Sequence, residues 1–112
     1  NNRDILEGAL AADFVSDPNN EKLQNLTAAF KERYNSDIRY PNYTSAVYDS
    51  LYVIKDAILA VGYDAEKIAE WGRTSIKDWP GASGLITVGP NGERSGGHIL
   101  KEIKGGKLEL AR

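Results

Sequence analysis

The sequence predicts an α/β fold in which one strand and three helices precede several β segments. Two patterns lead to this prediction. Apolar residues recur at helical spacing through the middle of the chain, and short β-rich runs separated by glycine turns fill the C-terminal part. A length of 112 residues is enough for one small domain with its own core, so residues 1–112 are expected to form a single domain.

The chain is expected to begin with a strand and an amphipathic helix. Residues Gly8–Val15 are short and apolar, which favours a buried strand, although periodicity alone does not exclude a helix. Asp17 is the predicted N-cap of the helix, with Pro18 at its first position, and Asn35-Ser36-Asp37 would end it. The apolar face of this helix would be formed by Leu23, Leu26, Phe30 and Tyr34.

The second predicted helix has the clearest pattern in the chain. Gly62 would end it, and its buried stripe would consist of Val47, Leu51, Ile54, Ile58 and Val61. Asp64 can cap a third helix that runs to about Trp71, with Gly72 weakening its end. Two amphipathic helices need a sheet to cover, and one strand is too small for that. The chain also contains no methionine, so we expect a processed product, a cloned fragment or one piece of a longer protein. The other strands would then lie in the preceding part.

The C-terminal part is predicted to be a series of turned β segments. Leu85–Val88 is apolar and β-branched, as a strand is, and Asn91-Gly92 after it predicts a type I′ hairpin turn. A second β-rich run covers His98–Ile103. The turn at Gly105-Gly106 would then lead into a final segment, Lys107–Leu110.

The composition excludes several functional classes. The net charge of −2, with Lys and Arg scattered, offers no basic surface for nucleic acid or an anionic membrane. No apolar stretch approaches the ~20 residues that a membrane-spanning helix needs. There is no cysteine and His98 is the only histidine, so no metal site is predicted and His98 is expected on a strand surface. The carboxylates are dispersed, so we predict no catalytic residue, no cofactor and no enzyme activity.

The six tyrosines, all between residues 34 and 63, are the remaining candidates for ligand contact. Most are expected at the rim of the core, with their hydroxyls reaching water. Tyr43 is the strongest candidate for a ligand-binding residue, because it stands at the junction between a loop and the second helix. Helix N-terminal junctions are common places for ligand contacts.

Several short motifs occur in the order found near the C-terminus of one protein family. They are Glu7-Gly8, Phe30 with Tyr34, Tyr48-Asp49-Ser50, the glycine-rich set Gly81, Gly84, Val88, Gly92 and Arg94, and Ile103-Lys104-Gly105-Gly106-Lys107. As an ordered set they resemble the type I periplasmic solute-binding proteins, which include the branched-chain amino-acid receptors of ABC transporters. Ser50 stands where that family usually has Ala, and Val88 stands where it usually has an aromatic residue.

The resemblance implies a partial Rossmann-like lobe, the C-terminal third of a two-lobed protein that closes on its ligand. It implies binding of an amino acid or similar solute for an ABC transporter permease, in the periplasm or outside the cell, with a lipid anchor as an option in the full-length protein. Tyr43 corresponds to an aromatic residue that contacts the ligand side chain in leucine-type receptors. Two alternatives stay open: a ligand-sensing domain of a receptor or regulator with the same fold, and a standalone α/β interaction domain.

Overall fold

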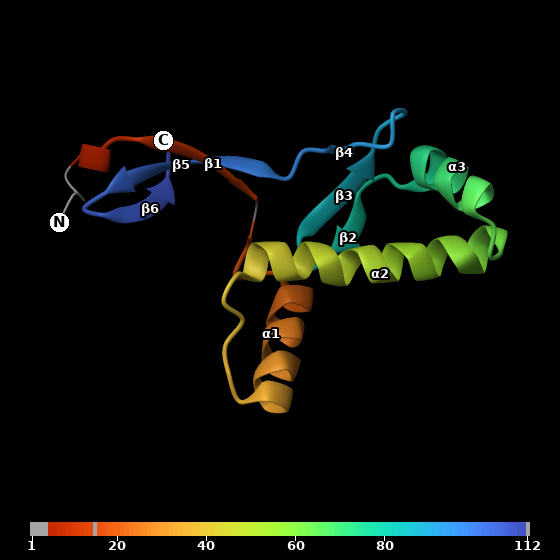
Figure 1. Cartoon of the computed structure of the whole chain (residues 1–112), viewed down its shortest axis with the longest axis horizontal. Coiled ribbons are helices and arrows are strands. Elements are labelled where there is room, and N and C mark those ends of the chain that lie inside the picture. The colour runs from red at the N-terminus through yellow and green to blue at the C-terminus, as the bar shows by residue number, and fades with distance from the viewer. Residues whose placement is uncertain (1–4, 15, 112) are drawn as a thin grey trace. The chain divides into compact units, whose positions relative to one another are not determined.

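The computed structural model describes residues 5–14 and 16–111 of the chain (Figure 1). These residues divide into two compact units, each of which is described by itself. Of the described residues, the first unit contains 5–14 and 98–111, and the second unit is Ser16–Gly97. The chain therefore enters the second unit once and returns to the first.

The first unit is built on an antiparallel three-stranded sheet in the order β1-β5-β6. Its strands are β1 (Leu10–Phe14), β5 (His98–Lys104) and β6 (Lys107–Leu110). Phe14 lies opposite His98 and Leu10 opposite Glu102. Gly105 and Gly106, with φ of 56° and 74°, form the two-residue connection between β5 and β6, for which a type I′ turn requires positive φ at both positions.

The strand predicted at the start of the chain is confirmed, but its burial is not. Within Gly8–Val15 the strand covers Leu10–Phe14, and Val15 lies outside the described residues. Leu10 and Ala12 are exposed, while Ala11, Asp13 and Phe14 are half-buried. Successive side chains of a strand point to opposite faces of the sheet, so an apolar run is buried throughout only where both faces are covered.

The second unit begins with α1 (Glu21–Tyr34), which starts three residues later than the sequence predicts. Asn20, not Asp17, is the N-cap: its side-chain oxygen accepts from the backbone N–H of Leu23 at 3.1 Å. The Asp17 carboxylate accepts from a backbone N–H two residues along at 2.9 Å, which makes a turn ahead of the helix and leaves Pro18 outside it. An aspartate can accept a backbone hydrogen bond either as an N-cap or within a turn. Its residue type therefore does not decide which of the two forms at Asp17.

The other helix ends are closer to prediction. Asn35, with φ of 49°, ends α1 in the left-handed conformation, and Gly62 follows the last residue of α2 (Pro41–Val61). Asp64 caps α3 (Ala65–Ser75) as predicted, through a 3.0 Å bond from the N–H of Lys67. This helix continues past Trp71 to Ser75, so Gly72 does not weaken it enough to end it.

The buried face of α2 is not the predicted apolar stripe. Val47, Leu51 and Ile54 are 66%, 65% and 49% exposed, and the buried residues of the helix are Ser45, Asp49 and Ala57. Apolar residues surround most of this helix, so periodicity could not choose between its faces. The face that packs within the unit carries Asp49, whose carboxylate accepts from the backbone N–H groups of Ala82 and Ser83.

The second sheet of the chain has the order β2-β3-β4. Its strands are β2 (Trp79–Gly81), β3 (Gly84–Val88) and β4 (Arg94–Ser95), all antiparallel neighbours. The predicted strand Leu85–Val88 is confirmed within β3. The core of this unit is formed by Leu23, Ala57, Ile76, Ala82 and Ile86.

The predicted type I′ turn at Asn91-Gly92 is wrong in detail. Gly92 has φ of 85°, but Asn91 is not among the non-glycine residues with positive φ. The N–H of Gly92 donates to the oxygen of Gly89 at 2.9 Å, and the N–H of Gly89 donates to the oxygen of Glu93 at 2.8 Å. Pro90 sits second in this turn, where its fixed φ favours a type I turn followed by a glycine in the left-handed region.

Candidate functional site

Asp49 is the most constrained polar residue of the second unit. It is 1% exposed, and its two carboxylate oxygens accept from the N–H of Ala82 at 2.7 Å and of Ser83 at 2.8 Å. The Ser83 hydroxyl donates to the same carboxylate at 2.6 Å. A Cβ on Gly81 would overlap this carboxylate, so the close approach of the β2–β3 turn to α2 requires glycine there. We name Asp49, Gly81, Ala82 and Ser83 together the Asp49 turn lock.

Arg94 extends the turn lock from β4. Its guanidinium donates to the Ser83 hydroxyl at 3.0 Å, to the Ser83 carbonyl at 3.1 Å and to the Leu85 carbonyl at 3.3 Å. Four of the residues that carry the family resemblance, Asp49, Gly81, Gly84 and Arg94, thus belong to one turn and its supports. The contacts of these motif residues hold the β2–β3 turn against α2.

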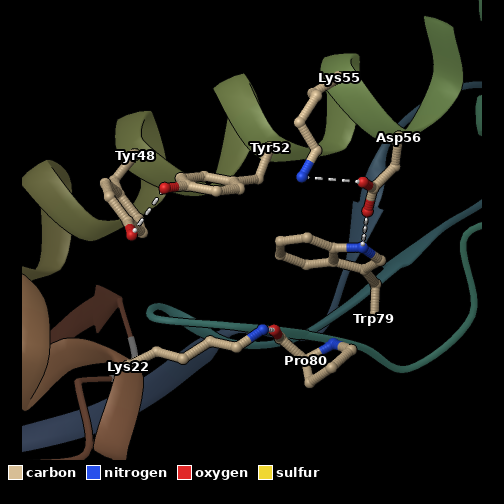
Figure 2. Close-up of polar contacts among 7 residues, drawn as sticks. All are labelled: Lys22, Tyr48, Tyr52, Lys55, Asp56, Trp79 and Pro80. Atoms are coloured by element: carbon tan, nitrogen blue, oxygen red, sulfur yellow. Dashed lines mark hydrogen bonds and ion pairs between the residues drawn. The ribbon is translucent and has the colours of Figure 1, made fainter. Parts of the chain in front are cut away.

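A pocket of about 390 Å³ lies beside the turn lock, between α1, α2 and β2. Figure 2 shows Asp56 reaching from α2 to Trp79, Tyr48 and Tyr52 side by side further along the same helix, and the Lys22 side chain extending toward Pro80. The Trp79 indole N–H donates to Asp56 at 3.1 Å, and the Lys55 ammonium lies 3.6 Å from the other oxygen of Asp56. We call this the Lys22–Trp79 pocket.

Two lysines lie over aromatic rings of the Lys22–Trp79 pocket. The Lys22 ammonium is 4.9 Å from the centroid of the Trp79 ring and donates to the Pro80 carbonyl. The Lys55 ammonium is 5.1 Å from the Tyr52 centroid. Both distances are within the range of cation–π attraction, which holds the two positive charges at the pocket.

The paired tyrosines of α2 form one wall. The hydroxyl of Tyr48 donates to that of Tyr52 at 3.2 Å, and the ring centroids are 4.8 Å apart. This hydrogen bond raises the pKa of Tyr48 above its ordinary value of 10.0, and partial burial and the Asp49 charge act in the same direction. The Tyr48 hydroxyl therefore stays protonated at physiological pH and can donate its hydrogen bond to Tyr52.

Tyr43, the ligand-binding residue predicted from the sequence, lies in the first turn of α2 and is 57% exposed. Its ring meets that of Tyr40 edge to face, with centroids 6.5 Å apart. It also lines a shallow apolar groove of about 400 Å³ with Leu26, Thr44, Val47, Tyr48 and Leu51. The role of Tyr43 in ligand binding stays a prediction.

The other sequence predictions about sites concern single residues and metal. His98 is exposed on β5 and its ring stacks on that of Phe14 at 4.8 Å, as a strand-surface side chain can. Among residues 5–14 and 16–111, no group of three potential metal ligands comes together. No helix within the described part of the chain has the length and apolar character to cross a membrane.

Sequence reasoning missed the Lys22–Trp79 pocket. Its members come from segments 58 residues apart, as between Lys22 and Pro80, and no local spacing connects them. The Tyr48-Asp49 motif was recognised, but only the fold reveals that the Asp49 carboxylate is buried against a distant turn.

Comparison with known proteins gives matches among solved structures. No protein-family model and no curated protein sequence matches this chain. A leucine-binding protein from Thermotoga maritima is similar with a TM-score of 0.69 and 28% identity, over 96% of this chain and 31% of that one. An ABC transporter substrate-binding protein from Desulfitobacterium hafniense in complex with Leu has a TM-score of 0.65 and 22% identity, over 95% of this chain and 32% of that one.

A third similar structure is a solute-binding protein of an ABC transporter from R. palustris in complex with benzoate. It has a TM-score of 0.63 and 20% identity, over 94% of this chain and 29% of that one. The chain thus spans about a third of the length of the solved structures that it matches. The α/β fold class is confirmed, and the chain has the fold of a partial lobe of a type I periplasmic solute-binding protein, the family that its sequence resembles.

Proposed function

We propose that this chain is the C-terminal third of an extracytoplasmic solute-binding protein that delivers an amino acid to an ABC transporter permease. The observation that carries the proposal is the agreement in fold, over nearly the whole chain, with substrate-binding proteins of ABC transporters. Two of these similar proteins are a leucine-binding protein and a protein in complex with Leu, which favours an amino acid as the solute. On this proposal residues 1–112 form a single partial domain that catalyses nothing and, by itself, binds no free amino acid tightly.

The exposed apolar face of α2 supports the proposal that more protein covers it. Val47, Leu51 and Ile54 each expose about half or more of their surface on one side of a helix whose other side is packed. A helix that is apolar around most of its circumference is typical of a protein interior. We propose that strands from the rest of the longer protein pack on this face.

Tyr43 is proposed to contact the side chain of the bound solute in the intact protein. Its ring is largely exposed at the start of α2, beside the apolar groove of Leu26 and Leu51. An aromatic ring in that position can cover an aliphatic ligand side chain without needing a charged partner. The groups that would bind the ammonium and carboxylate of an amino acid are proposed to lie in the other two thirds of the protein.

Calorimetry on the complete gene product containing this chain tests the proposal. Leucine, valine and benzoate are titrated into the complete protein and into residues 1–112 alone. We expect a Kd of about 1 μM or tighter, near −8 kcal/mol, for an amino acid with the complete protein and no tight binding with residues 1–112. Micromolar binding of leucine or valine by residues 1–112 alone, or no response of the complete protein to either amino acid, would overturn it.

Substitution of Tyr43→Ala in the complete protein tests the site. Removal of the ring should weaken amino-acid binding about five- to 150-fold, equivalent to about 1–3 kcal/mol of lost apolar contact. The melting temperature should change little, because the ring is mostly exposed. An unchanged affinity together with a lowered melting temperature would leave Tyr43 a purely structural residue.

A further inference from the structure

The Lys22–Trp79 pocket contains a positive charge that the protein itself does not neutralise. The Lys22 ammonium donates to the neutral carbonyl of Pro80 and lies over the Trp79 ring, and the ion pairs within the described part of the chain do not include it. Lys22 is also in the first turn of α1, where the helix dipole is positive and favours a nearby anion. This corner of the pocket therefore attracts negative charge.

The two carboxylates at the pocket are already occupied. Asp49 uses both oxygens on the β2–β3 turn. Asp56 accepts from the Trp79 indole with one oxygen and faces the Lys55 ammonium with the other. Both carboxylates that line the pocket thus have other partners. Neither competes with an incoming anion for the Lys22 ammonium.

The remaining walls of the pocket are aromatic. Trp79 lies on β2, and Tyr48 and Tyr52 come from α2, as Figure 2 shows. The Trp79 indole is fixed at its N–H by Asp56, which keeps its ring in one orientation. Rings held in this way provide flat apolar surface on which a planar group can stack.

We propose that the Lys22–Trp79 pocket is a ligand site for a small carboxylate that carries a flat apolar group. The carboxylate would pair with the Lys22 ammonium by a charge-assisted hydrogen bond, and the flat group would stack on Trp79 toward Tyr52. The volume of about 390 Å³ is within the range of small-molecule sites. The pocket does not include Tyr43, so this inference does not depend on the proposed amino-acid site, although Tyr48 lines both the pocket and the groove beside Tyr43.

Fluorescence of Trp79 provides a direct readout. Trp71→Phe first removes the other tryptophan of the chain, so that the remaining emission comes from Trp79. The probe is 3-phenylpropanoate, and its neutral amide is the matched compound that keeps the ring but lacks the charge. We expect saturable quenching of Trp79 by the acid at millimolar concentration or below, and at least tenfold weaker binding of the amide.

Substitutions on α1 then locate the charge. Lys22→Gln should weaken binding of 3-phenylpropanoate at least tenfold, because, of the two lysines that line the pocket, it removes the one without an ion pair among the described residues. Lys31→Gln is the matched control on the same helix: Lys31 pairs with Asp37, lies outside the pocket and should leave the affinity unchanged. Circular dichroism of each variant checks that the helices are retained.

Three results would overturn the proposal. They are the absence of a Trp79 response to the acid, equal binding of acid and amide by the unsubstituted pocket, and equal weakening by Lys22→Gln and Lys31→Gln. The comparison of acid with amide needs no substitution in the pocket, so it decides the question even where a lysine variant fails to fold.

Discussion

Removal of the Asp49 carboxylate should be one of the most damaging single changes in the second unit. Asp49→Ala leaves the buried N–H groups of Ala82 and Ser83 without their acceptor, at original distances of 2.7 and 2.8 Å. A buried donor that loses its partner costs roughly 1–3 kcal/mol, so the two together predict a loss of about 2–6 kcal/mol in the free energy of unfolding. The Ser83 hydroxyl also loses Asp49 as its acceptor, although its oxygen still accepts from Arg94, so the estimate counts the two backbone groups alone.

The assay is urea unfolding followed by helical circular dichroism. Asp49→Asn keeps the size of the side chain but replaces one carboxylate oxygen with an NH₂ group. This donor would face a backbone N–H of Ala82 or Ser83, so the variant should also have a lower free energy of unfolding. Asp37→Asn is the control: this carboxylate forms an exposed ion pair with Lys31 and should contribute about 1 kcal/mol or less.

A double-mutant cycle sharpens the test. Gly81→Ala should be strongly destabilising in the unsubstituted chain, because the new Cβ overlaps the Asp49 carboxylate. In the Asp49→Ala background the overlap is gone, so Gly81→Ala should cost less, with a coupling energy of about 0.5–3 kcal/mol. A loss of less than about 1 kcal/mol for Asp49→Ala, or strict additivity with Gly81→Ala, would refute the turn-lock reasoning.

Three further predictions concern packing, protonation and turn geometry. Leu23 is 5% exposed, so Leu23→Ala should lower the free energy of unfolding by about 2–5 kcal/mol in denaturant unfolding of this chain. Leu51→Ala should lower it by about 1 kcal/mol or less, because Leu51 is 65% exposed. A larger loss for Leu51→Ala than for Leu23→Ala would mean that the helix faces are misassigned. Tyr52→Phe removes the main cause of the raised Tyr48 pKa, so alkaline absorbance titration should show Tyr48 ionising nearer to 10.0. Because the folded-state pKa is the higher one, the Tyr48 contribution to stability is present below about pH 10 and is lost as pH rises through that pKa; an unchanged titration of the variant would contradict this. Gly105→Ala places a Cβ at φ of 56° and should cost about 1 kcal/mol, with Gly105→Asn costing less because asparagine tolerates this region; equal melting temperatures for the two variants would argue against a positive φ at this turn.

The sequence by itself determined the order of the elements and most of their positions. The β3 strand, the final hairpin and the Asp64 cap follow from residues that are neighbours in the chain. Such features depend on local backbone preferences, which act wherever the segment lies. The errors at local level, at Asp17 and Asn91, occurred where the residue type suits two competing turn geometries.

Only the tertiary structure decided which face of α2 is buried and what its motif residues do. Val47 and Leu51 satisfy the helical period as well as any core residue, yet they are exposed, and Asp49 is buried. Burial of a charged group is costly unless hydrogen-bond partners compensate it. For the Asp49 carboxylate such a partner is the backbone N–H of Ala82, 33 residues further along the chain. The Lys22–Trp79 pocket has the same origin, because its charges and rings come from three elements that only folding brings together. Local spacing reports the preferences of single segments, whereas a site depends on where packing places several of them.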